Sequence, residues 1–414
     1  MNLDHVRELI VNGQLLTAAR FDEFQQGWLD GDRRTDEGAE FIHWLVDEHE
    51  LTEFQAQALL AGIPGPYLLG PYRVTARITA GRLGDVYHAE HAEFQQPVSL
   101  KVFPASLNQD PELTARLGRE ARVSLQMDSP HVVKTFQVGR VGAIPFIALE
   151  SLRGETLEQR LDRDGRIPQV EACQLIQQAA RGLAHIHSQE TIHRDICPAN
   201  LWVSDTGVVK IMEFGAARDA LSFLDSLGDG GNLTVSQTAD DHRVTLTINE
   251  AGGSVLGHYP YMSAEQAEDP HTANEASDLY SLGCTFYHCL TGQVPFPDKN
   301  PVRQMLRHAN EPPCPLTDFV SDMPQVVQDV VSYLLAKRPE DRYGSADEVA
   351  AALAAIIPLA ALPAAAVVAP GFLEWVQTVD DGSFGVVVEE PRELELQQFV
   401  AWLSEHVVDE ENAA

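Results

Sequence analysis

The chain has 414 residues, 44% of them hydrophobic, and a formal net charge of −32 at pH 7. A chain of this length is expected to form two or three units, with a full hydrophobic core in the largest. Because so negative a surface repels phosphate backbones and anionic lipids, the composition excludes nucleic acid binding as a main role and disfavours a membrane-surface role.

Cysteine usage and the first residues indicate a cytoplasmic protein. Neither the CxxC spacing nor the nearby histidine pairs of a zinc site occur among the five cysteines, Cys173, Cys197, Cys284, Cys289 and Cys314. Reduced thiols in a reducing compartment are therefore predicted. The charged residues Asp4, Arg7 and Glu8 stand where a secretion signal needs an unbroken apolar core, so no such signal is expected.

Residues 1–66 are predicted to form a small helical module of two helical hairpins that share one core. A weak internal repeat supports this, because the Leu-Thr pair at Thr17 recurs at Thr52 and each threonine can cap a following helix. Thr52 and Gln55 together have the spacing of a capping box. No constellation of polar groups marks a ligand site, so the module is interpreted as a folding or docking appendage. Pro64 and Pro66 then indicate a linker.

A strand-rich segment begins at Tyr72. Residues 78–87, Ile-Thr-Ala-Gly-Arg-Leu-Gly-Asp-Val-Tyr, have the pattern of a glycine-containing hairpin between two strands. The next predicted strand, 98–102, carries Lys101, one of five lysines in the chain. A helix is expected to begin at Asp110-Pro111 and to include Glu120, and residues 146–152 read as a further buried strand.

The motif that organises the chain is His193-Arg194-Asp195-Ile196-Cys197-Pro198-Ala199-Asn200, followed by Glu213-Phe214-Gly215. It resembles the catalytic loop of protein kinases, His-Arg-Asp-x-Lys-Pro-x-Asn, and the metal-binding Asp-Phe-Gly that follows it. Residues 72–357 thus resemble the bacterial eukaryotic-type Ser/Thr protein kinases. The resemblance implies an α+β, two-lobed kinase fold with a small lobe at 72–150 and a large lobe at 151–357, preceded by the helical N-terminal domain.

The same resemblance implies an ATP site. Lys101 corresponds to the lysine that contacts the α- and β-phosphates, and Glu120 to the helix glutamate that pairs with it. Glu150 and Leu152 correspond to the hinge whose backbone binds adenine. The full set of implied nucleotide-binding residues is Ile78, Gly81, Gly84, Val86, Ser99, Lys101, Glu120, Glu150 and Leu152. Thr79 replaces the first glycine of the family's loop, which stiffens the hairpin and keeps the close approach at Gly81 and Gly84.

For the chemistry, the resemblance makes Asp195 the base that accepts the substrate hydroxyl proton, and Asn200 and Glu213 the Mg²⁺ ligands. Two positions depart from the family. Cys197 replaces the lysine that steadies the γ-phosphate, and Glu213 replaces a shorter aspartate, so both phosphotransfer and the Mg²⁺ site should be weakened. Two functions remain open: a pseudokinase-like protein that binds ATP and acts through a protein partner, and an active Ser/Thr kinase that uses Glu213 as metal ligand.

The activation segment implied by the resemblance runs from Glu213 to Glu265, and its excess length lies in 221–254. Alternating residues at 233–235 and 244–248 fit either a β-hairpin insert or a disordered excursion. The hydroxyls of this segment could be phosphorylated, and Arg194 would then be the natural partner of the phosphate.

Two further residues in the large lobe are implied to be structural, because they match positions that hold the kinase fold together. Asp278 should order the catalytic-loop backbone, and Arg342 should pair with Glu265.

From the last residues of the kinase-like region onward, positions 349–370 carry no charged residue. The prolines and alanines of this stretch favour an Ala/Pro linker at 358–370 over a membrane span, since no Lys or Arg cluster flanks it. Residues 371–414 are predicted to be an acidic tail. The stripe of Leu396, Phe399, Val400, Leu403 and Val407 in this tail is interpreted as a helical packing face.

Overall fold

The computed structural model describes residues 1–31, 34–63, 67–79, 85–103, 121–142, 144–212, 232–237, 244–249, 253–255, 259–268, 272–357, 368–379 and 387–388. The described residues form two compact units. The first unit takes residues up to Gln126, then Lys134–Ser151, and then the chain from Ala366 onward. The second unit takes Met127–Val133 and Leu152–Ala365.

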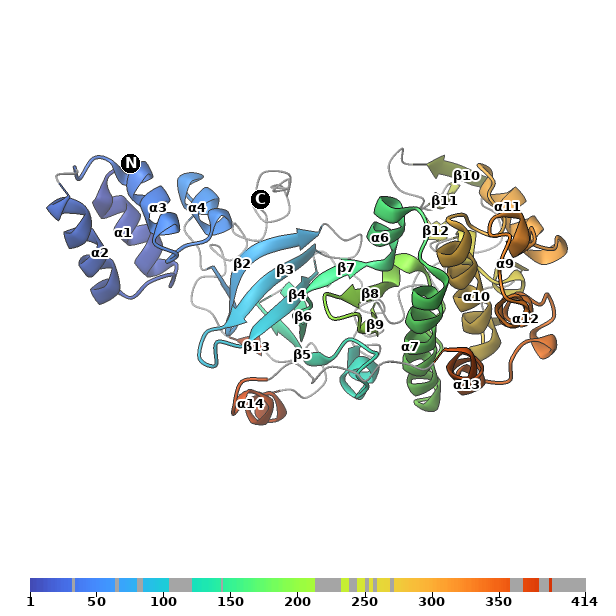
Figure 1. Cartoon of the computed structure of the whole chain (residues 1–414). Helices are drawn as coiled ribbons and strands as arrows, with labels where there is room; N and C mark the ends of the chain where they lie inside the picture. Colours follow the sequence, from blue (N-terminus) through green and yellow to red (C-terminus); the bar gives the residue numbers. More distant parts are fainter. Residues whose placement is uncertain are drawn as a thin grey trace. The chain divides into compact units, whose positions relative to one another are not determined.

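Four helices open the first unit: α1 (Leu3–Asn12), α2 (Ala18–Asp30), α3 (Gly38–Asp47) and α4 (Glu53–Leu60) (Figure 1). The repeated threonines cap helices as predicted. Thr17 accepts a hydrogen bond from the backbone of Arg20 at the start of α2. Thr52 and Gln55 complete the capping box of α4. Phe21, Trp28 and Phe41 pack edge to face at the centre of the four helices, as expected for one shared core.

A seven-stranded sheet follows, in the order β1-β2-β3-β4-β6-β5-β13. Its strands are β1 (Leu68–Leu69), β2 (Tyr72–Thr79), β3 (Asp85–His91), β4 (Pro97–Val102), β5 (Thr135–Val141), β6 (Ile144–Glu150) and β13 (Val387–Val388). All neighbours are antiparallel except β13, which lies parallel to β5. The curled sheet, preceded by the four N-terminal helices, confirms the α+β class.

The two faces of this sheet differ in burial. Along β3, Tyr87, Ala89 and His91 are buried, whereas the residues between them are only half-buried. The buried face belongs to one continuous hydrophobic core, to which α4 contributes Phe54 and the C-terminal helix α14 (Phe372–Val379) contributes Phe372. The other face is left less covered, which is the arrangement a ligand-binding sheet face requires.

The sequence did not predict that the end of the chain packs on this sheet. Phe372 is fully buried, and its ring lies edge to face against Phe136 of β5 and His91 of β3. The backbone nitrogen of Ala369 donates to Gln96 Oε1 over 2.7 Å. The described part of the predicted acidic tail is therefore a helix that packs into the core of the first unit and a strand that pairs with β5. The predicted stripe from Leu396 to Val407, and linker residues 358–367, lie outside the described residues.

The second unit is mainly helical. Its helices are α6 (Leu157–Asp164), α7 (Gln169–Ser188), α9 (Ala264–Glu268), α10 (Glu275–Thr291), α11 (Pro301–Asn310), α12 (Gln325–Leu334) and α13 (Ala346–Ile356). A small sheet, β7 (Gly154–Thr156), β8 (Leu201–Ser204) and β9 (Val209–Ile211), carries the segment after the catalytic loop. The apolar side of α7 is buried from Cys173 to Ile186. Figure 1 shows α7 between this small sheet and helices α10 and α13.

The long activation segment contains a separate antiparallel sheet of β10 (Asn232–Gln237), β11 (Val244–Asn249) and β12 (Gly253–Val255). The pairing of β10 with β11 is the hairpin that the sequence offered as one of two alternatives. The third strand was not predicted. Residues 213–231, which include Glu213, lie outside the described residues.

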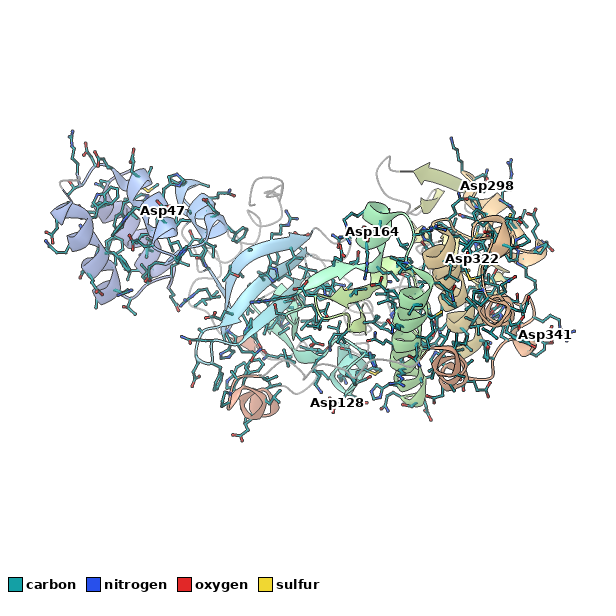
Figure 2. The ribbon with its side chains drawn as sticks, in the orientation of Figure 1. Asp47, Asp128, Asp164, Asp298, Asp322 and Asp341 are labelled. Carbon is teal, nitrogen blue, oxygen red and sulfur yellow. The ribbon has the colours of Figure 1, made fainter. Side chains whose placement is uncertain are left out.

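The acidic composition is visible at the surface. Among the labelled aspartates of Figure 2, the side chains of Asp47, Asp128, Asp164, Asp322 and Asp341 are exposed, as a strongly acidic surface requires. Within the part of the chain that the structure describes, no helix combines the length and the apolar character needed to cross a bilayer.

Candidate functional site

The catalytic-loop backbone is held by one buried carboxylate, that of Asp278 on α10. Its Oδ2 accepts from the backbone nitrogen of His193 over 2.8 Å, and its Oδ1 accepts from that of Arg194 over 2.7 Å. His187 Nε2 lies 2.9 Å from the same Oδ2. Asp278 is fully buried, so these bonds compensate the removal of its charge from water. This is the ordering role that the sequence predicts for Asp278.

Arg194 adopts a left-handed backbone conformation, with φ of 72°. A non-glycine residue in this region stores strain of about 1–3 kcal/mol and persists only where its surroundings fix it. Here Asp278 binds the backbone nitrogen of Arg194, and Gln266 Nε2 from α9 donates to its carbonyl over 3.1 Å. The loop is thus fixed from both sides of its strained residue. Nothing in the sequence indicated this role of Gln266.

Asp195 and Asn200 lie together at the end of the loop. Asn200 Nδ2 donates to the backbone oxygen of Asp195 over 2.8 Å and to its carboxylate Oδ2 over 3.0 Å. The amide of Asn200 thereby orients the carboxylate of the half-buried Asp195. Since the amide nitrogen is used in this way, Oδ1 is the atom of Asn200 with the chemistry of a Mg²⁺ ligand.

His193 connects the loop to the segment that leads into Glu213. It is fully buried, its Nδ1 accepts from the backbone nitrogen of Asp195, and its Nε2 lies 2.8 Å from the carbonyl of Met212. The backbone nitrogen of Met212 also donates to the carbonyl of Asn200. The residue just before Glu213 is therefore positioned by the catalytic loop itself.

Cys197 occupies the position of the family's catalytic lysine, and its side chain is completely buried. Tyr261 is a neighbour of Cys197. Burial raises the pKa of the Tyr261 phenol well above the ordinary value, and the proximity of Cys197 raises it further. The Tyr261 hydroxyl is bonded to His288 Nδ1 over 2.7 Å. Position 197 therefore lies in a packed environment and presents no ammonium group.

The predicted pair between Glu265 and Arg342 is present. Arg342 Nη1 and Nη2 donate to the two carboxylate oxygens of Glu265 over 2.6 and 3.0 Å, in the bidentate geometry typical of strong arginine pairs. Burial alone would raise the pKa of Glu265, but the hydrogen bonds and charge of Arg342 lower it below its ordinary value. The end of the activation segment is thereby anchored to the helical unit.

In the first unit, three predicted nucleotide contacts share the less covered face of the sheet. Val86 of β3 pairs directly with Lys101 of β4, and Ser99 lies two residues before Lys101 on the same face. Lys101 Nζ lies 6.0 Å from the centre of the Phe103 ring. A cation on a sheet face beside aliphatic residues has the chemistry needed for a phosphate and an adjoining aromatic base.

The predicted hinge residues lie at the change from one unit to the other, which falls between Ser151 and Leu152. The side chain of Glu150 is engaged inside the first unit, because its Oε1 accepts from the backbone nitrogen of Lys134 over 2.8 Å. Four predicted site residues, Gly81, Gly84, Glu120 and Glu213, lie outside the described residues, so the pairing of Lys101 with Glu120 stays a prediction.

The described residues fit the nucleotide and the metal that the motifs imply. Lys101 supplies the positive charge on the sheet face, and Asn200 supplies an amide oxygen beside the carboxylate of Asp195. No group of three or more His, Cys, Asp or Glu side chains among the described residues is arranged to hold a metal ion by itself.

Comparisons with known proteins agree with this geometry. The profile of the family described as "Protein kinase domain" matches residues 72–353. The Ser/Thr-protein kinase PknB of Mycolicibacterium smegmatis is 33% identical over 291 residues, which is 69% of this chain and 43% of PknB. PknA of Mycobacterium tuberculosis is 31% identical over 297 residues, or 70% of this chain and 62% of PknA. The similar region thus spans less than half of PknB.

The solved PknI kinase domain of Mycobacterium tuberculosis superposes with a TM-score of 0.50 at 23% identity, and covers 69% of this chain and 96% of that domain. This likeness supports the fold alone. The family match covers well over half of the chain, and the loop residues lie where the motifs place them. The chain therefore belongs to the protein kinase family, as a homologue of the bacterial eukaryotic-type Ser/Thr kinases.

Proposed function

We propose that this protein binds ATP, and that its phosphotransfer is weakened or lost, so that it serves as a signalling or scaffold protein acting through a protein partner. The observation that carries the proposal is the completely buried thiol of Cys197 within an otherwise well-formed catalytic loop. A thiol is ordinarily protonated at pH 7. It cannot replace an ammonium group that would reach the γ-phosphate.

The remaining residues keep separable roles. Lys101 holds a positive charge on the sheet face of the first unit, where it would bind the α- and β-phosphates of ATP. Asn200 orients the carboxylate of Asp195, which can accept the proton of a substrate hydroxyl. ATP supplies the transferable phosphoryl group. Binding therefore depends on residues that the chain retains, whereas stabilisation of the transition-state charge depends on positions 197 and 213, where the chain departs from the family.

The alternative function is that of an active Ser/Thr kinase with Asp195 as base and Glu213 as Mg²⁺ ligand. The oriented pair of Asp195 and Asn200, and the fixed conformation of Arg194, favour it. Mg²⁺ demands near-octahedral geometry at about 2.1 Å, which a glutamate arm one methylene longer than aspartate satisfies less readily. The missing positive charge at position 197 weighs further toward the weakened enzyme. The spacing of the cysteines supports a cytoplasmic location for either function.

The proposal is tested by measuring binding and transfer separately on the full chain. ATP at millimolar concentration should raise the melting temperature with or without Mg²⁺, and incorporation of labelled phosphate into the chain or into a basic model protein should be slight. The absence of any shift in both conditions would exclude ATP binding. Strong incorporation that disappears in Asp195→Asn would establish the active kinase instead.

A further inference from the structure

Helix α4 of the N-terminal module is bonded directly to strand β2. Thr52 Oγ1 donates to the carbonyl of Thr75 over 2.6 Å, and Gln55 Nε2 donates to the carbonyl of Val74 over 2.9 Å. The β2–β3 register shifts between Val74 and Ala76, so these two carbonyls lie at an irregularity where the ladder pairing is interrupted. The residues that cap α4 thus also satisfy the backbone of the interrupted strand.

Each of these two side chains has two tasks. Thr52 Oγ1 accepts from the backbone nitrogen of Gln55 while it donates to the strand. Gln55 Oε1 accepts from the backbone nitrogen of Thr52 while its amide nitrogen donates to the strand. Gln55 is 3% exposed, so water offers no substitute partner. Each side chain of the capping box therefore makes one hydrogen bond that caps α4 and one that holds β2.

A second contact reaches the far end of the same pair of strands. The Phe54 ring of α4 lies 6.4 Å from that of Tyr87 on β3. The Tyr87 hydroxyl donates to Asp85 Oδ2 over 3.1 Å, and Arg77 of β2 donates to the same oxygen over 2.8 Å. The Arg77 side chain is 6% exposed, so this ion pair is largely shielded from solvent. It joins β2 and β3 beside Ile78 and Val86, the nucleotide contacts expected on these strands.

The internal repeat provides a natural comparison. Thr17 occupies the position in the first hairpin that Thr52 occupies in the second, and it also caps its helix. Its side chain is exposed, and within the described chain its one hydrogen bond is that from the Arg20 backbone. Both threonines cap a helix, but only Thr52, with Gln55 as its capping-box partner, also holds the sheet.

We propose that Thr52 and Gln55 are positioning residues for ATP, and that the N-terminal module acts on nucleotide affinity by fixing the β2–β3 strand pair. The proposal rests on the proposed function, since it assumes that ATP binds the sheet face carrying Val86 and Lys101. The module is then an input to the kinase-like region, because whatever alters the module alters the strands that carry Ile78 and Val86.

Two substitutions cut the contact without removing the helix cap. In Gln55→Glu the carboxylate can still accept from the Thr52 backbone, and glutamate is a regular partner in capping boxes, but it cannot donate to Val74. In Thr52→Asp the side chain can still accept from the Gln55 backbone, but it cannot donate to Thr75. Thr52→Ser retains both bonds and is the rescue variant. Thr17→Ala is the matched control, because it removes an equivalent cap at a distance from β2.

ATP dissociation constants are measured on the full chain by titration, together with the amide hydrogen exchange of β2 and β3. Gln55→Glu and Thr52→Asp should each weaken ATP binding about fivefold, which corresponds to about 1 kcal/mol, the net contribution of one hydrogen bond. Both should also speed exchange in β2 and β3. Thr52→Ser and Thr17→Ala should bind ATP like the wild type, even where Thr17→Ala lowers the melting temperature.

The positioning role is overturned if both tether variants are folded and bind ATP as tightly as the wild type. It is equally overturned if Thr17→Ala weakens binding as much as they do, since general destabilisation would then explain the effect. A wild type that binds no ATP refutes the proposed function instead. In that case unchanged exchange in β2 and β3 of Gln55→Glu would refute the mechanical link as well, and faster exchange would retain it.

Discussion

Replacing Asp278 by asparagine should destabilise the second unit more than any other single change of one carboxylate to an amide in its described part. The carboxylate accepts hydrogen bonds from the backbone of His193 and Arg194 and lies within bonding distance of His187 Nε2. Asparagine has one acceptor oxygen where aspartate has two. At least one of the loop N–H groups must then face an amide N–H₂ group, which cannot accept.

The magnitude follows from these bonds. A buried donor left without a partner costs about 1–3 kcal/mol, and a hydrogen bond to a charged acceptor contributes about 1.5–3 kcal/mol where a neutral one contributes about 1. We therefore expect Asp278→Asn to lower the free energy of unfolding by about 3 kcal/mol. Typical domains are stable by only about 5–15 kcal/mol, so the loss is a large fraction. It should also release the left-handed conformation of Arg194, because one of its two fixing bonds disappears.

Chemical denaturation gives the free energy, and hydrogen exchange of residues 193–200 reports the loop directly. Asp322→Asn is the control, since it removes the same charge from an exposed site. The reasoning is wrong if the free energies of unfolding of Asp278→Asn and of this control differ by less than about 0.5 kcal/mol, a typical range for surface substitutions. The buried bonds would then not stabilise the loop.

Three further outcomes are expected. Restoring Cys197→Lys and Glu213→Asp together should raise phosphate incorporation more than the two single changes combined, and Asp195→Asn should abolish the gain; additive effects would contradict the shared role of charge and metal geometry. Deleting residues 221–254 should leave the melting temperature nearly unchanged, whereas loss of cooperative unfolding would show that this sheet belongs to the core. Burial lowers the pKa of His308 to about 3, so the neutral form is favoured in the folded state. The free energy of unfolding should be highest above pH 6.5 and should fall by about 2 kcal/mol by pH 5. Chemical denaturation at each pH should show a smaller fall in His308→Asn.

Most of the second unit could be predicted from the sequence, because its key residues belong to motifs whose residues follow at fixed spacings. Asp278, Glu265 and Arg342 belong to ordered motifs, and their bonds in the structure are those that the resemblance implies. The hydrogen bond from Asn200 to Asp195 was not predicted, because the resemblance gives these two residues separate roles. Gln266 was missed because nothing in its neighbourhood distinguishes a side chain that bonds a carbonyl 72 residues away.

The first unit was predicted less completely, and the reason is physical. The capping box at Thr52 and Gln55 is a local pattern, visible within four residues, whereas its bonds to β2 depend on tertiary placement. Helix α14 offers only two turns of apolar periodicity after a run of alanines and prolines, so its docking on Phe136 left no signal in the sequence. Gln96, which accepts from the backbone nitrogen of Ala369 just before this helix, lies 273 residues earlier in the chain.

Within the described part of the chain, the side chains of three residues hold the catalytic loop. Asp278 and Gln266 bind the backbone of Arg194, and Asn200 binds the carboxylate of Asp195. These bonds need no charged side chain at position 197, so under the proposed function the loop geometry can persist while phosphotransfer weakens. The cost is in the transition state instead, where one missing electrostatic donor is typically worth about 3 kcal/mol, or roughly a hundredfold in rate. Under the proposed function, such a chain would retain a binding fold while its turnover falls, which is the combination that a nucleotide-dependent scaffold requires.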